Sequence, residues 1–146
     1  MKHSKFLPLV AGLALSTTLV VSPAVAEVMK FAAALDGAHE VPPTDSEGTG
    51  KLDATYDTQS KELGWSLDYN GLSGPATAAH FHGPAGPGEN ADVQVPIPDP
   101  QSGTKGTATL TDEQAKDLMD GKYYVNVHTD KHPDGEIRGQ VEKVGE

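Results

Sequence analysis

Two histidines stand two residues apart in the stretch 78–84, AAHFHGP. In a β-strand, residues i and i+2 point to the same face, so His80 and His82 are expected to present two imidazoles side by side. Imidazole nitrogens are suitable ligands for copper, zinc and nickel. The pair therefore indicates a candidate transition-metal site, which needs further ligands from elsewhere in the chain.

His128 is the best candidate for a third ligand. It lies near the end of a predicted strand and on the same side of that strand as Tyr124 and Asn126. Neighbouring strands of a sheet are about 5 Å apart, so an imidazole on one strand can join a pair on the next. Three imidazoles with an open fourth position suit Cu(II), Zn(II) or Ni(II), and Cu(II) binds most tightly of these. The ligand set alone leaves the choice among these three metals open.

The fourth group is open between two residues. His39 precedes Glu40 and a Pro-Pro turn, and Glu136 opens the last predicted strand. Either could bind the metal, or could orient an imidazole through its N–H. The alternative for Glu136 is an ordinary surface ion pair with Arg138. A histidine is also often a hydrogen-bonded or surface residue with no ligand, an interpretation that suits His132 in its turn.

Composition excludes several classes of function. The chain has no cysteine, which rules out disulfides and disfavours a thiolate zinc site. Its formal net charge of −10 argues against a nucleic-acid partner. No glycine-rich phosphate loop precedes a predicted helix, and no serine or cysteine nucleophile motif is present.

The N-terminus is typical of a secretory signal peptide. A basic start is followed by an apolar run and by small residues at 24–26, so cleavage is expected after Ala26. The apolar run is shorter than the roughly 20 residues that span a bilayer, which disfavours a retained membrane anchor. We expect residues 1–26 to be the signal peptide and residues 27–146 to form one periplasmic or secreted domain, with no membrane attachment after cleavage.

The rest of the chain has the pattern of an all-β domain. Apolar and polar residues alternate clearly at 50–58, 63–69, 122–129 and 136–143, which predicts strands with one buried face. Further strands are expected at 28–36, where a short helix is the alternative, in the segment that carries His80 and His82, and at 93–97 and 106–110. Residues 83–105 are rich in Gly and Pro and should be mostly irregular.

One short helix interrupts the strands. Thr111 and Gln114 have the spacing of a capping box, and Ala115, Leu118 and Met119 form an apolar stripe. Trp65 is expected in the core. The order and number of these elements predict an antiparallel β-sandwich or barrel of about seven to eight strands with one short helix.

Several runs resemble the CHRD domain, a family that takes its name from the extracellular antagonist chordin. These runs are GAHEVPP at 37–43, GLSGPATAAHFHGPA at 71–85, YVNVHT at 124–129 and GEIRGQ at 135–140. The family pattern usually has Gln at the position of His39. The resemblance spans about residues 31–141 and implies an extracytoplasmic β-sandwich.

A looser likeness is to copper–zinc superoxide dismutases. These proteins also place a His-x-His pair and a later histidine around copper, on a Greek-key sandwich. This chain shows no counterpart of their bridging histidine, zinc loop or disulfide. The likeness therefore favours a superoxide-dismutase-like fold and copper, and does not establish the activity.

Three functions follow as hypotheses. The first is an exported copper-binding domain, for sequestration, delivery or tolerance of the metal. The second is a metal-free module that holds another exported protein or a matrix. The third is a dismutase-like enzyme, which the acidic charge disfavours because superoxide is an anion.

Overall fold

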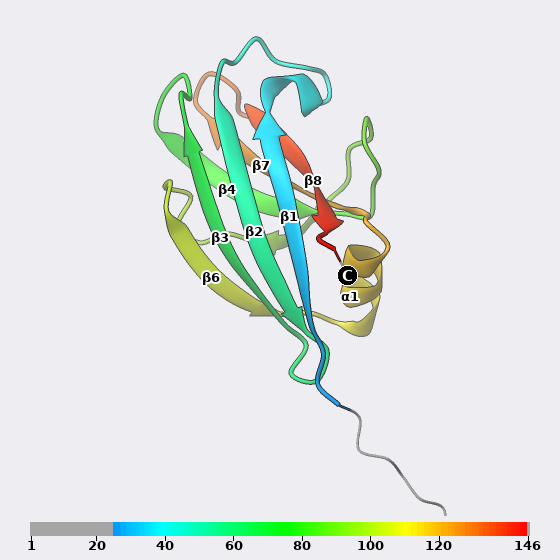
Figure 1. The fold of residues 1–146 in the computed structure, drawn as a ribbon. Coiled ribbons are helices and arrows are strands. Elements are labelled where there is room, and N and C mark those ends of the chain that lie inside the picture. The colour runs from blue at the N-terminus through cyan, green and yellow to red at the C-terminus, as the bar shows by residue number, and fades with distance from the viewer. Residues whose placement is uncertain (1–24, 146) are drawn as a thin grey trace, which may run out of the picture.

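The computed structural model describes residues 25–145 and consists almost entirely of β-strands (Figure 1). The predicted signal peptide, residues 1–26, lies almost wholly outside the described residues. The elements, in chain order, are β1 Val28–Asp36, the 3₁₀-helix η1 Gly37–His39, β2 Thr49–Asp57, β3 Glu62–Asn70, β4 Ala76–His82, β5 Val93–Pro96, β6 Thr104–Thr109, the helix α1 Asp112–Met119, β7 Tyr123–Thr129 and β8 Ile137–Lys143.

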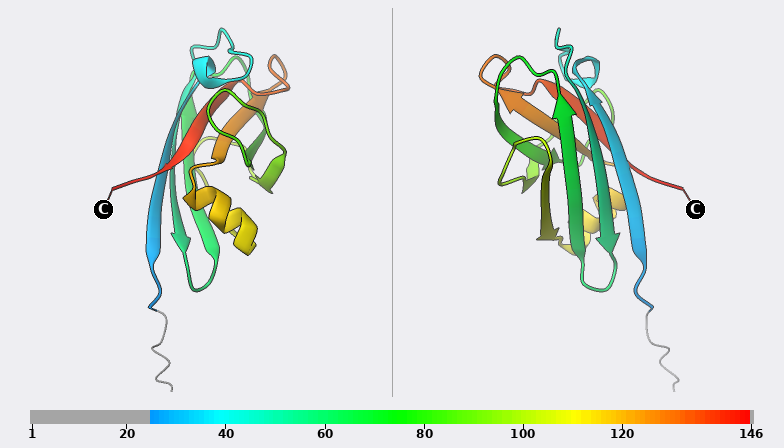
Figure 2. Two further views of the ribbon diagram at one scale, coloured as in Figure 1. Left: turned by 90° about the vertical axis from the view of Figure 1, so that its right-hand side faces the viewer. Right: turned by 60° about the vertical axis from the view of Figure 1, so that its left-hand side comes forward.

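All eight strands belong to one antiparallel sheet in the order β5-β4-β7-β8-β1-β2-β3-β6. The sheet curls into a nearly closed barrel, so that β1, β2, β3 and β6 face the other four strands across the core (Figure 2). The expected all-β antiparallel fold with one short helix is therefore confirmed. Residues 28–36 form a strand, and the helical alternative for this segment is wrong.

The core lies between the two halves of the barrel and consists of the inward-facing residues, which alternate with outward-facing ones along the strands. Trp65 on β3 meets Phe81 on β4 edge-to-face, with ring centroids 5.4 Å apart. Leu52, Leu63 and Leu67 are fully buried beside them. Trp65 is thus a core residue, as predicted.

Close backbone contact joins the two halves where β8 crosses to β1. A Cβ atom at Gly139 would lie 2.4 Å from the carbonyl oxygen of Ala34. Only glycine allows the two strands to approach this closely at that point. The continuous sheet therefore depends on Gly139.

Helix α1 connects β6 to β7. Its capping box is present, with Thr111 and Gln114 exchanging side-chain and backbone hydrogen bonds. Ala115 and Leu118 pack into the core, whereas Met119 is exposed although the predicted stripe included it. Gln114 also donates to the carbonyl of Gln94 on β5, which links the helix to an edge of the sheet.

Strand β7 differs from its prediction in one respect. All seven of its residues are buried, including the polar face of Tyr124, Asn126 and His128. The inner face packs in the core, while the outer face is covered by chain segments that follow β4 and β7. One of them is the roof loop, residues 83–92, which runs over the outside of the sheet and donates to it and accepts from it.

Candidate metal site

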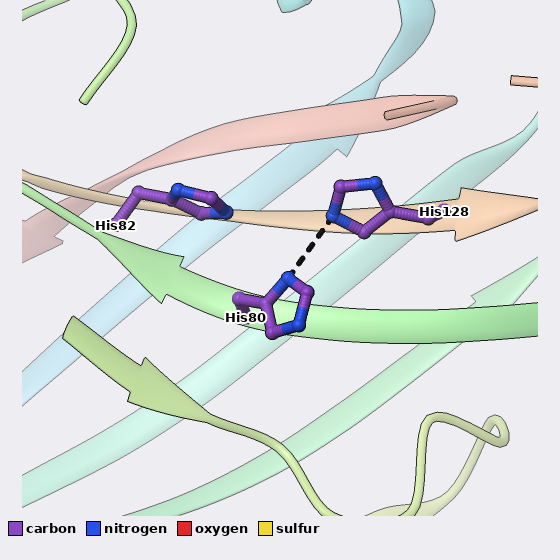
Figure 3. Close-up of side chains that lie close together, drawn as sticks. All are labelled: His80, His82 and His128. Atoms are coloured by element: carbon purple, nitrogen blue, oxygen red, sulfur yellow. Dashed lines mark hydrogen bonds between the residues drawn. The ribbon is translucent and has the colours of Figure 1, made fainter. Parts of the chain in front are cut away.

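Three imidazoles meet on the outer face of the sheet (Figure 3). His80 and His82 come from β4 and His128 comes from β7. One ligand nitrogen of each ring lies within 4.8 Å of the others. This is the group that the sequence predicted, and it is the one group of at least three potential His, Cys, Asp or Glu ligands found within residues 25–145.

Strand register explains why the rings meet. In the β4–β7 pair, Ala78 lies opposite His128 and His80 lies opposite Asn126. His128 is therefore a diagonal neighbour of His80 on the same face, a position from which long or aromatic side chains can touch. The ring centroid of His80 is 5.0 Å from that of His128 and 5.5 Å from that of His82.

Backbone carbonyls fix the orientation of two rings. Nδ1 of His82 is 2.9 Å from the carbonyl oxygen of Ala91, and Nδ1 of His128 is 2.9 Å from that of Pro133. A carbonyl oxygen only accepts, so each Nδ1 carries the proton and donates. Each Nε2 then keeps its lone pair, that of His82 without a partner and that of His128 toward His80. This is the arrangement by which metal-binding histidines are held in place.

The third ring contacts its neighbour directly. Nδ1 of His80 lies 3.1 Å from Nε2 of His128, a distance that a hydrogen bond explains (Figure 3). Since Nε2 of His128 accepts, Nδ1 of His80 donates in the metal-free chain. A metal ion would replace this hydrogen bond and draw on the same nitrogens.

The environment favours neutral imidazoles. His82 and His128 are each 9% exposed, and His80 is half-buried. Burial lowers the pKa of His80, and the nearby His128 and His82 lower it further. Burial also lowers the pKa of His82, although its hydrogen bond to Ala91 acts in the opposite direction. Neutral rings keep the lone pairs that metal binding requires.

Arg138 fastens the roof loop over this site. It is the only arginine in the chain and is 1% exposed. Its Cζ atom lies 3.5 Å from the centroid of the Tyr124 ring, which stacks in parallel on His82 at 4.9 Å. Its guanidinium donates to three acceptors of the roof loop, the carbonyls of Gly86 and Glu89 and the side chain of Asn90. The loop so fixed carries Ala91, whose carbonyl orients His82.

The structure does not bring His39 into the group. Its ring is exposed at the end of η1, and its Nδ1 lies 2.6 Å from the carboxylate of Asp36. That contact holds His39 on its own 3₁₀ turn.

Glu136 also lies outside the group and is completely buried. Its carboxylate accepts hydrogen bonds from Ser46, from the backbone and side chain of Ser73, and from Thr129. Burial opposes its ionisation, but these donors outweigh burial and lower the pKa of Glu136 to about 2. The surface ion pair with Arg138 is wrong as an interpretation, because both residues are buried and engage other groups.

Three buried polar side chains, Glu40, Asn126 and Arg138, form a polar layer together with the three imidazoles. Sequence reasoning did not single out any of these three residues. Burial raises the pKa of Glu40 to about 7, against the opposing effects of Arg138, the Val41 backbone and Asn126. One signal was available, namely a single arginine among ten lysines, in an outward position of the last strand. Arginine is the usual choice where one planar cation must bind several acceptors.

The fold and the cluster together describe an all-β module with a group of metal-competent imidazoles on the outside of its sheet. The family model of the CHRD domain matches residues 31–141, and the chain therefore belongs to the CHRD family, a module of extracellular type. The comparison with curated proteins and the comparison with solved structures each found no significant match. Within residues 25–145, no helix has the length and apolar character needed to cross a membrane.

Proposed function

We propose that this CHRD module is exported and binds one copper ion through His80, His82 and His128. One observation carries the proposal. The Nδ1 atoms of His82 and His128 each donate to a backbone carbonyl, which leaves both Nε2 lone pairs on the side where His80 lies. Ordinary buried histidines need one such hydrogen bond each, but they have no reason to cluster with their remaining nitrogens inward.

The donor set favours copper over zinc. The chain has no thiolate to offer, and three imidazoles with a weak or open fourth position suit Cu(II), which binds most tightly among the divalent ions of its row. Zinc is the alternative. A copper site on an exported module would serve sequestration, delivery or tolerance of copper in the periplasm or outside the cell. The signal-peptide pattern and the extracellular type of the family support this location.

The test is a titration of the purified chain with Cu(II) against a competing chelator. We expect one ion per chain, and an affinity that falls at least 100-fold in His80→Ala and in His82→Ala, because each loses a ligand. His39→Ala and His132→Ala are matched controls, since these histidines lie outside the group and should leave the affinity unchanged. Stoichiometric tight binding that survives both ligand substitutions would rule this site out.

A second function has a specific observation in its favour. His80 and His128 are hydrogen-bonded to each other at 3.1 Å, and the backbone carbonyls of Ala91 and Pro133 accept from His82 and His128, respectively. These contacts can hold the base of the roof loop without any ion. The module would then bind another exported protein or a matrix, and copper would have no effect on its stability.

A further inference from the structure

Asn126 lies at the centre of the polar layer beside the three imidazoles. On β7 it stands two residues from Tyr124 and two from His128, so all three side chains leave the same face of the strand. Its register partners are His80 on β4 and Arg138 on β8. The side chain is 3% exposed. An amide is thus buried next to the candidate ligands, and its side chain carries an oxygen that could bind a metal.

Glu40 determines which way this amide faces. The Nδ2 atom of Asn126 and the Oε1 atom of Glu40 both lie against Gly135, at 2.8 Å and 2.3 Å from the position that a Cβ atom there would occupy. The ionised carboxylate only accepts, so Nδ2, the donor atom of the amide, is the atom suited to lie on its side. The Asn126 amide accordingly favours the ionised form of Glu40 and so opposes the rise in its pKa. With Nδ2 turned toward Glu40, Oδ1 points to the other side.

Two buried acceptor atoms are left on that other side. Within residues 25–145, Oδ1 of Asn126 and Nε2 of His82 are both buried without a hydrogen-bond partner. Asn126 pairs with His80, which stands two residues from His82 on the same face of β4, and its amide raises the pKa of His82 against the effect of burial. Nδ1 of His82 carries the ring proton, so neither of the two atoms has a proton to give the other in the neutral chain. An unpaired buried acceptor destabilises the folded chain, and a cation bound by both atoms would remove that penalty.

We propose that Oδ1 of Asn126 is the fourth ligand of the metal ion held by His80, His82 and His128, and that Glu40 is the residue that positions it. The inference rests on the proposed function and extends it from three ligands to four. An amide oxygen is a weak ligand for copper, of the kind found in axial positions beside imidazoles. A hydrogen bond that orients such a ligand is a usual feature of metal sites.

The test compares copper binding and the electron paramagnetic resonance spectrum of the Cu(II) form in wild type, Asn126→Leu and Asn126→Asp. We expect Asn126→Leu to bind copper about tenfold more weakly, with an altered spectrum that still shows nitrogen ligands. Asn126→Asp should bind at least tenfold more tightly, because it offers an anionic oxygen at the same place. Asn70→Leu is the matched control. It removes an amide of the same type from an exposed position at the end of β3, outside the group.

The role of Glu40 is tested by a pair of variants. Glu40→Gln keeps an acceptor oxygen beside the Asn126 amide and should retain the wild-type affinity and spectrum. Glu40→Leu removes the acceptor and should weaken copper binding toward that of Asn126→Leu. A loss in both variants, or in neither, would contradict a positioning role.

The outcomes separate the two proposals. Wild type that fails to bind copper overturns the proposed function and this inference with it. Wild type that binds copper with a spectrum unchanged in Asn126→Leu overturns the inference alone. If Asn126→Leu does not fold, Asn126→Asp decides, and an affinity and spectrum equal to those of wild type exclude the amide as a ligand.

Discussion

The roles of His39, His82 and His128 follow from the contacts of their Nδ1 atoms. Nδ1 of His82 and of His128 donates to a backbone carbonyl, whereas Nδ1 of His39 contacts the carboxylate of Asp36 at the surface. The rings of His82 and His128 are thereby fixed with unprotonated Nε2 atoms in the group with His80, whereas His39 remains on its own turn. Residue type alone does not separate these cases, because all are histidines near strand ends.

Two buried glutamates show how strongly surroundings control ionisation. Glu136 is surrounded by hydroxyl and amide donors, which lower its pKa to about 2. Glu40 lacks such a set of donors, and burial raises its pKa to about 7. Glu136 therefore stabilises the folded chain above its ordinary pKa, and this contribution is lost in acid. Glu40 behaves in the opposite way, which gives a measurable pH dependence.

The free energy of unfolding of the wild type should fall between about pH 5 and about pH 8 because Glu40 titrates, and we predict that Glu40→Gln abolishes this fall. From about pH 5 to about pH 7 the folded chain keeps a proton on Glu40 that the unfolded chain, with the ordinary pKa of 4.5, has already released. The free energy of unfolding of the wild type therefore falls as pH rises through the pKa of about 7. The difference between variant and wild type should change by roughly 2–3 kcal/mol across the window.

Denaturant unfolding with a chelator present measures this difference, and every group that titrates equally in both chains cancels. Glu62→Gln is the control, because that glutamate is exposed on β3. A difference between Glu40→Gln and wild type that does not vary with pH would show that Glu40 is ionised in the folded chain throughout.

At the residue scale, the sequence predicted the three imidazoles but not the groups around them. His80, His82 and His128 lie in strands, where period-2 alternation fixes the face and only the pairing partner has to be guessed. Glu40 and Glu136 lie beside strands, in segments whose course depends on the rest of the fold. The position of such residues follows from contacts distant in sequence, such as that between Ser73 and Glu136.

Among the elements, the roof loop is the one whose conformation was least visible in the sequence. Its Gly and Pro content predicted an irregular path, and the short strand β5 at its end was also expected. Its position over the sheet is determined by Arg138, which lies about 50 residues further along the chain and donates to Asn90 and to two loop carbonyls. Local sequence patterns cannot report a contact of that separation.

We predict that Arg138→Met loosens the roof loop and weakens copper binding. The variant loses hydrogen bonds from a charged donor, each worth about 1.5–3 kcal/mol, and with them the fixed position of Ala91. Copper affinity should fall about tenfold although no ligand is removed. Hydrogen exchange should become faster at the amides of residues 85–91, while those of β2 and β3 keep their protection.

Arg138→Lys should give an intermediate result, because a lysine cannot donate to several acceptors in the fixed geometry of a guanidinium. Lys105→Met serves as the control, since that lysine is exposed on β6, whereas the roof loop follows β4 near the other end of the strand order. Unchanged loop exchange in Arg138→Met would mean that other contacts hold the loop.

At the scale of the whole molecule, the fold class followed from counting strands and turns, whereas closure of the sheet did not. The alternation at β2 and β3 is easy to recognise because the outer faces of these strands are polar. The joining of β8 to β1 depends on Gly139 and on a pairing between the two ends of the chain. A single glycine in a strand suggests close approach of another backbone, but it does not say of which one.

We predict that copper raises the melting temperature of the whole module. A ligand that binds only the folded chain adds about 2.7 kcal/mol to the free energy of unfolding at 100 times its dissociation constant. For a domain of this size the shift should be roughly 5–15 °C, reversed by a chelator and absent when His80, His82 and His128 are all replaced by alanine. A melting temperature that does not respond to copper would favour the metal-free interaction module.

The imidazoles and the core occupy opposite faces of the same two strands. Ala79 and Phe81 on β4, and Val125 and Val127 on β7, point inward, while the histidines alternate with them and point outward. Evolution can therefore add or erase the metal ligands one residue at a time without repacking the interior. Two CHRD proteins can share this barrel and yet differ in whether they hold an ion, so membership of the family alone does not decide the chemistry of a given member.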